Sequence, residues 1–176
     1  GNKVIIQGGR ITTTGEQHYA ELVVLDNAQK ATVLNTTNSN VTFDKAVVNA
    51  DSTMPQDLTI NAGTGDVTFT GVVGEDDVVN TPASGNTPAV VKNGALGNLI
   101  INSQGVTTFV STVDAASLKT DVDTVNIDVS AATNKIIIQG GRITTTGEQH
   151  YAELVVLDNA TQATVLNTIN SNVTFD

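Results

Sequence analysis

The only histidines are His18 and His150, which occupy equivalent positions in two copies of one sequence segment. As a catalytic base, each would need a partner within hydrogen-bond reach, and Glu16 is the nearest carboxylate to His18 in the sequence. The two histidines would lie one whole repeat apart, which is too far for them to share a metal ion. We therefore expect each to lie in a surface turn, with no catalytic residue in the chain.

Carboxylates are the other candidate ligands. Asp76 and Asp77 follow Glu75 in the densest acidic cluster, and Asp121 and Asp123 alternate, so that they would point to one face of a strand. Calcium takes six to eight oxygen ligands, but the EF-hand spacing and the glycine-rich nonapeptide pattern are both missing. We expect solvated acidic loops and no cofactor, with calcium at these four aspartates as the alternative.

Composition argues against several other chemistries. There is no cysteine, no GxSxG motif and no complete phosphate-binding loop around Gly8-Gly9. A net charge of −10 disfavours nucleic acid as a partner, and no apolar run approaches the 18 residues that membrane insertion needs. The sequence therefore predicts a protein that is not an enzyme. A β-helical carbohydrate-active enzyme, which would need clustered carboxylates in a groove, is the less favoured alternative.

The strongest feature is a long internal repeat. Residues 2–44 recur at 134–176, and 39 of the 43 aligned positions are identical. Repeats of this kind indicate tandem architectures in which neighbouring units bury a continuous core. We divide the chain into one unit at 1–132 and the start of the next at 133–176, and we expect the ends of this chain to cut a longer one.

A finer repeat lies within the unit. An apolar residue and Asn precede a Thr-Phe pair, and Val follows four residues after the ring. These positions predict a structural ladder of asparagines and rings, formed by Asn35, Asn61, Asn102, Tyr19, Phe43, Phe69, Phe109, Tyr151 and Phe175. We interpret the longer ring spacings as two turns each. This interpretation predicts 20 to 26 residues per turn, and about six turns and roughly 29 Å per unit at 4.8 Å per turn.

The predicted fold class is therefore all-β, a right-handed parallel β-helix (β-solenoid). The chain has 27 Thr, 24 Val and 12 Ile, which favour extended strands, and only 3% aromatic residues. Short apolar runs such as 3–7, 10–13, 21–25, 31–35 and 124–129 are separated by turn-forming Gly, Asn, Asp and Ser. The proline-containing segment 75–97 breaks this rhythm and predicts a loop insertion in the wall.

Four segments resemble filamentous-haemagglutinin-type repeats of giant bacterial surface proteins: VTFTGVVG, LGNLIINSQGVTTF, VDAASLKTD and GGRITTTGEQHYAELVVLD. The resemblance implies a secreted, extracellular shaft at the bacterial cell surface, used for adhesion or filament formation. The implied partners are neighbouring units or identical subunits stacked end to end. The alternative is a module that binds a glycan or a cell-surface ligand through the 75–97 loop.

Overall fold

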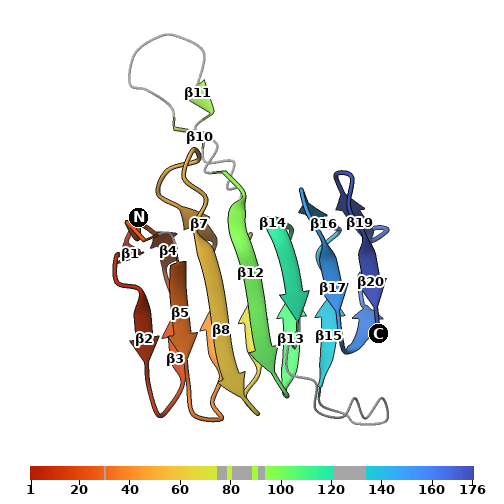
Figure 1. The fold of residues 1–176 in the computed structure, drawn as a ribbon, viewed down its shortest axis with the longest axis horizontal. Helices are drawn as coiled ribbons and strands as arrows, with labels where there is room; N and C mark the ends of the chain where they lie inside the picture. The colour runs from red at the N-terminus through yellow and green to blue at the C-terminus, as the bar shows by residue number, and fades with distance from the viewer. Residues whose placement is uncertain (30, 75–78, 81–88, 91–93, 121–133) are drawn as a thin grey trace.

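The computed structural model describes residues 1–176 except 30, 75–78, 81–88, 91–93 and 121–133. The described chain is all-β and contains no helix, and its strands form parallel sheets (Figure 1). This part of the predicted fold class is confirmed. The strands are short because turn-forming residues interrupt the apolar alternation every few positions. Among the described residues, no helix has the length and apolarity needed to cross a membrane.

The chain passes repeatedly through three stacks of strands, which we call the first, second and third columns. The first contains β1 (Lys3–Ile6), β4 (Leu22–Leu25), β7 (Val47–Asn49), the start of β14 (Val113–Thr120), β16 (Arg142–Thr145) and β19 (Val165–Thr168). Isolated bridges through Val73 join β7 to β14 in this column.

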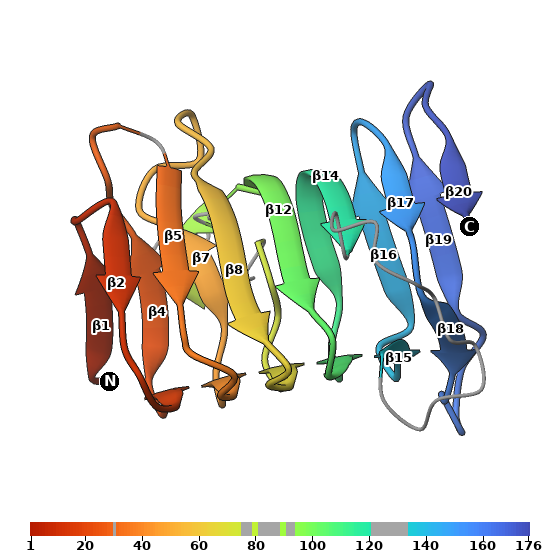
Figure 2. The same ribbon diagram turned by 60° about the horizontal axis from the view of Figure 1, so that its bottom comes forward.

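The other two columns are built in the same way. The second contains β2 (Arg10–Thr12), β5 (Ala31–Asn35), β8 (Asp57–Gly63), β12 (Leu96–Ser103), the end of β14, β17 (Gln149–Tyr151) and β20 (Val173–Phe175). The third contains β3 (Gln17–Tyr19), β6 (Val41–Phe43), β9 (Val67–Phe69), β13 (Val106–Phe109), β15 (Lys135–Ile138) and β18 (Leu154–Leu157). Figure 2 shows the layers following one another along the molecule in chain order.

The residues per circuit vary more than the sequence predicted. In the first column, residues paired between successive layers are 19, 24, 26, 40, 30 and 23 positions apart, from the first circuit to the last. The interpretation of the 40-residue ring spacing as two turns was wrong, because Phe69 and Phe109 pair directly in neighbouring strands. The insertion at 75–97 lengthens that circuit without adding a layer to a column.

The estimate of six turns per unit was therefore also wrong. In the third column β15 lies four layers after β3, in the order β3-β6-β9-β13-β15. In the first column the bridges through Val73 and β14 put β16 five layers after β1. At about 4.8 Å per layer, a unit that advances between four and five layers rises by roughly 22 Å.

A narrow apolar core fills the space between the columns. Alternate residues of each strand point inward. On the three sides of one layer, the buried side chains are Val23 and Leu25 in β4, Leu34 in β5, and Val41 and Phe43 in β6. At the turns the backbones of successive layers are almost in contact. A Cβ atom on Gly71 would lie 2.3 Å from the backbone carbon of Lys45, so only glycine fits there.

Part of the predicted 75–97 loop belongs to a strand, since β12 begins at Leu96. Within the insertion, β10 (Val79–Asn80) and β11 (Ala89–Val90) pair antiparallel, whereas every pairing within the columns is parallel. The predicted strand at 124–129 lies outside the described residues.

Candidate functional site

The predicted rings form two separate stacks. Tyr19, Phe43, Phe69 and Phe109 stack in the third column, with successive ring centroids 5.0, 4.9 and 5.4 Å apart and planes within 10° of parallel. Tyr151 stacks on Phe175 at 5.2 Å, but this pair lies in the second column. Ile138 of β15 pairs with Phe109, in the position where a single ladder would place the next ring. The structure thus brings together four of the six predicted rings.

The predicted asparagines lie together in the second column. The Asn61 side-chain amide donates to Asn35 Oδ1 at 2.7 Å, and the Asn102 amide donates to Asn61 Oδ1 at 2.6 Å. Asn35 in turn donates to the Thr12 hydroxyl at 3.3 Å. Each amide therefore bridges one layer to the layer before it, at half-buried positions along one side of the stack. This row of amides holds the layers in register.

Each histidine contacts an aspartate from the neighbouring layer. The Nε2 atoms of His18 and His150 lie 2.8 Å from Oδ2 of Asp44 and Asp176, respectively. The prediction that the histidines lie in surface turns was wrong. His18 is in β3 and His150 is in β17, where each lies between a Gln and a Tyr whose side chains turn inward. Glu16, the nearest carboxylate in the sequence, is not the contacting residue. His18 and both aspartates are exposed and His150 is half-exposed, so these surface contacts add little to folding stability.

Asp76, Asp77, Asp121 and Asp123 lie outside the described residues. In the part of the chain that the structure describes, no three His, Cys, Asp or Glu side chains gather closely enough to hold a metal ion. The prediction of calcium at the four aspartates therefore stays untested by this geometry.

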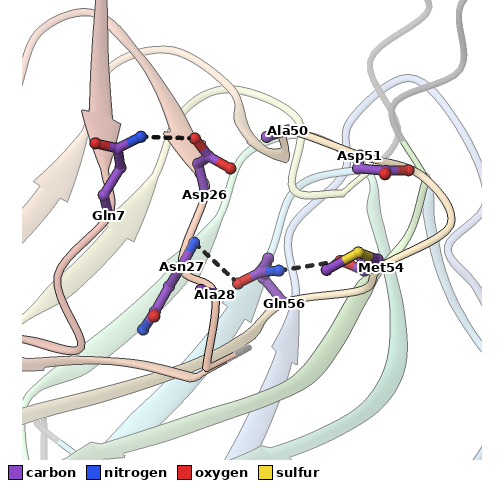
Figure 3. A pocket seen from close by; sticks show the side chains of 8 residues that line it. All are labelled: Gln7, Asp26, Asn27, Ala28, Ala50, Asp51, Met54 and Gln56. Atoms are coloured by element: carbon purple, nitrogen blue, oxygen red, sulfur yellow. Dashed lines mark hydrogen bonds between the residues drawn. The ribbon is translucent and has the colours of Figure 1, made fainter.

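Sequence reasoning missed a hollow at the corner between the first and second columns. Figure 3 shows the side chains that line it, which come from the turns of three successive layers. The hollow measures about 480 Å³, and its lining residues are Gln7, Asp26, Asn27, Ala28, Ala50, Asp51, Met54 and Gln56.

Polar groups of this hollow bond mainly to one another. Gln7 donates to Asp26 Oδ2 at 2.9 Å, and the Gln56 side chain accepts from the Asn27 amide at 3.3 Å and donates to the Met54 carbonyl at 3.1 Å (Figure 3). Hydrogen bonds from the Thr53 hydroxyl and amide lower the pKa of Asp51. Among the described residues, the lining has neither a cation nor a nucleophilic hydroxyl or thiol. Its hydrogen bonds join the turns of neighbouring layers. The recurrence of Asp-Asn at 26–27 and 158–159 is the one sequence signal for it.

The most informative surface is the terminal layer formed by β18, β19 and β20. Its exposed apolar side chains are Leu154, Leu157, Val165, Ile169 and Phe175. In the first copy the equivalent strands β4, β5 and β6 are covered by β7, β8 and β9. Leu25 is consequently 0% exposed and its equivalent Leu157 60%, while Phe43 is 1% exposed and its equivalent Phe175 55%.

For the equivalent layer of the first copy, the covering residues are described pair by pair. In the first copy Val23 pairs with Val47, Leu34 with Ile60 and Phe43 with Phe69. Because 134–176 repeats 2–44 so closely, a segment with the sequence of residues 45–69 has the matching register and apolar side chains for β18, β19 and β20.

Comparison with family models, curated proteins and solved structures found no match to this chain. The resemblance to filamentous-haemagglutinin-type repeats stays a prediction from the sequence.

Proposed function

We propose that this chain is a structural repeat of a long, right-handed β-solenoid shaft whose units stack end to end, with a mechanical role and no catalytic one. The observation that supports the proposal most directly is the contrast between equivalent residues, Leu25 against Leu157 and Phe43 against Phe175. The same side chains are buried where the next layer follows and bare where it does not. A further copy of the same repeat would bury these exposed side chains.

Parallel pairing gives the shaft its cohesion. Each layer uses its backbone groups on the layers before and after it, so an uncovered layer offers unpaired donors and acceptors as well as apolar side chains. Covering a leucine or phenylalanine stabilises the stack by about 1.5–3 kcal/mol for each side chain buried. The stacked rings and the row of asparagine amides add contacts that repeat with every layer. Length then follows from the number of units.

The proposed setting is the bacterial cell surface, where the shaft serves adhesion or filament formation outside the cell. Support comes from the sequence resemblance and from the acidic charge, since like-charged exposed fibres remain soluble. The proposed partners are neighbouring units of the same repeat or identical subunits stacked end to end.

An extended chain tests the stacking. Residues 1–176 are followed by a further copy of the sequence of residues 45–69, and the product is compared with the original chain. We expect the extension to cover Leu157 and Phe175 and to pair with the Val155 and Val173 amides, so that these two amides exchange more slowly and the thermal midpoint rises. A control extension carries Asp at the positions equivalent to Val47, Val67 and Phe69, and it should give neither change. Equal exchange of the Val155 and Val173 amides in the two extended chains would contradict the proposal.

A second candidate function is binding of a glycan or a cell-surface ligand by the 75–97 insertion. The observation in its favour is the antiparallel pairing of β10 with β11, which sets the insertion apart from the columns. Deletion of residues 75–93 keeps Gly94 and Ala95, whose carbonyls accept from the Asn49 side chain at 3.1 and 2.6 Å. The variant should lose attachment to cells while its circular dichroism stays unchanged. Unchanged attachment would exclude this function.

A further inference from the structure

The two copies of the repeated segment occupy different columns. β1, β2 and β3 lie in the first, second and third columns, in that order. Their equivalents β15, β16 and β17 lie in the third, first and second. Each strand of the second copy is therefore one column earlier than its counterpart in the first copy. We infer that successive units of the shaft are rotated by one face relative to one another, an inference that rests on the proposed stacking of units.

The internal structure of the segment is unchanged by this rotation. Lys135 pairs with Leu154 as Lys3 does with Leu22, and β16–β19 and β17–β20 repeat the registers of β2–β5 and β3–β6. The segment thus turns as one body of two layers. Only the column in which each strand of this body stacks on the preceding layer is different.

The rotated segment is well packed against that layer. Ile136 pairs with Thr107 and Ile138 with Phe109 in the third column, and both isoleucines are completely buried. In the other columns Ile143 pairs with Val113 and Tyr151 with Thr120, again with both side chains at 0% exposure. The fit is possible because strands of all three columns have the same alternation of inward and outward side chains. A strand from one column can therefore occupy another with its inward side chains still buried.

Polar contacts at the junction also match the rotated arrangement. The Leu118 amide donates to the Glu148 carbonyl at 3.0 Å, and the Lys119 ammonium lies 3.7 Å from the Glu148 carboxylate. On the first column Arg142 lies 3.8 Å from Asp114. A Cβ atom on Gly140 would lie 2.0 Å from the carbonyl oxygen of Ser111, so this turn of the rotated copy needs glycine.

The rotation determines what the shaft presents to its surroundings. With three columns and one face of rotation per unit, every third unit returns to the same orientation, after roughly 67 Å at about 4.8 Å per layer. The corner hollow and the exposed turn at Met54 would then appear on three sides of the shaft in succession. A cell surface or neighbouring fibre meets the same features whichever side of the shaft it approaches.

Cysteine pairs in the 176-residue chain test the rotation directly, because the natural sequence has no cysteine. In the rotated arrangement Lys119 and His150 are paired neighbours, so Lys119→Cys with His150→Cys should form a disulfide on mild oxidation. An unrotated junction would place His150 in the third column with Thr108, the column that holds its equivalent His18. The Thr108→Cys/His150→Cys variant reports that alternative and should stay reduced.

A positive control uses His18→Cys with Thr42→Cys, a pair within the first copy that is adjacent in both arrangements. Cross-linking of the Lys119/His150 pair at the rate of this control, with the Thr108/His150 pair unreactive, supports the rotation. A reactive Thr108/His150 pair, or an unreactive Lys119/His150 pair, overturns it. These cross-linking results depend only on the junction between the two copies within one folded chain. Failure of the extension experiment would instead show that the terminal layer does not accept a further layer.

Discussion

Residues 2–44 and 134–176 have nearly the same sequence, form the same strands, and differ in what covers them. Strands β1, β3, β4 and β6 have the same bounds as β15, β17, β18 and β20 after alignment of the two copies. Leu25 and Phe43 are nevertheless buried, while Leu157 and Phe175 are largely exposed. The local sequence therefore determines the strands and turns, whereas the next layer determines which side chains are buried.

Turn chemistry explains why the local level is so constant. Asn38 and its equivalent Asn170 both adopt a positive φ, of 51° and 57°. Asparagine tolerates this left-handed conformation better than most residues other than glycine. The turn therefore forms in both copies without help from a covering layer, and it directs the chain from the second-column strand of the first copy into the third.

The largest expected difference between the copies concerns the rings. Phe43 lies between Tyr19 and Phe69, so Phe43→Ala leaves a cavity and should lower the free energy of unfolding by about 3–5 kcal/mol. Phe175 has Tyr151 on one side only, and Phe175→Ala should cost about 1 kcal/mol. Urea denaturation of both variants measures the difference. Equal losses of unfolding free energy in the two variants would show that the covering layer contributes nothing at this position.

The asparagine row gives an intermediate difference. Asn61→Ala removes both the amide that donates to Asn35 and the oxygen that accepts from Asn102, which should cost about 1–3 kcal/mol. Asn167, the equivalent of Asn35 in the second copy, is exposed in the terminal layer, and Asn167→Ala should change stability by less than about 0.5 kcal/mol. The same denaturation experiment measures both. A large loss of stability for Asn167→Ala would show that an asparagine contributes without a covering layer, contrary to this prediction.

A smaller difference concerns the two tyrosines at high pH. Burial raises the pKa of Tyr19 to about 12, and burial raises the pKa of Tyr151 further. Because the unfolded pKa is about 10, the stability due to the neutral phenols is complete below about pH 10 and is lost as the pH rises toward the folded values. Denaturation midpoints should therefore fall between about pH 8 and pH 11.5, and the fall should be smaller for Tyr19→Phe and for Tyr151→Phe than for the natural chain. An identical fall in all three proteins would show that neither tyrosine is responsible.

The histidines should give the smallest effect and no difference between copies. Both Nε2–Oδ2 distances are 2.8 Å and both pairs are exposed, so His18→Ala and His150→Ala should each cost less than about 1 kcal/mol. Thermal unfolding at neutral pH is the measurement. A clearly larger loss for one histidine would show that its pair does more than bridge two layers at the surface.

The sequence was a good guide to the local structure. The strand predicted at 31–35 has the bounds of β5, and the runs at 3–7, 10–13 and 21–25 correspond to β1, β2 and β4 within one residue at each end. Alternating apolar residues between turn formers carry that information in a few neighbouring positions. The recurrence of Asn35, Asn61 and Asn102 similarly identified residues that lie in one row.

The arrangement of the layers was harder to predict. A ring spacing of 40 residues looks the same whether it is two turns or one turn with an insertion, and only the pairing of Phe69 with Phe109 decides between them. The change of column between Phe109 and Tyr151 has no local signal, because the strands of each column show the same inward alternation. The corner hollow needs turns from three layers, so it could not be recognised before the layers were aligned.

Backbone amide exchange in the 176-residue chain shows whether each layer is completed by the layer that follows it. The amides of Val23 and Val41 donate to Ala46 and Asp66 in the covering layer, and their equivalents in the second copy are Val155 and Val173 of the terminal layer. Our account predicts slow exchange at Val23 and Val41 and fast exchange at Val155 and Val173.

Asp26 and Asp158 provide the matched control, because both donate to the preceding layer, at 2.9 and 3.0 Å to the carbonyls of Ile6 and Ile138. They should exchange at more similar rates than the valine pairs. Equal protection of all four valine amides would contradict the claim that each layer is completed by the layer that follows it.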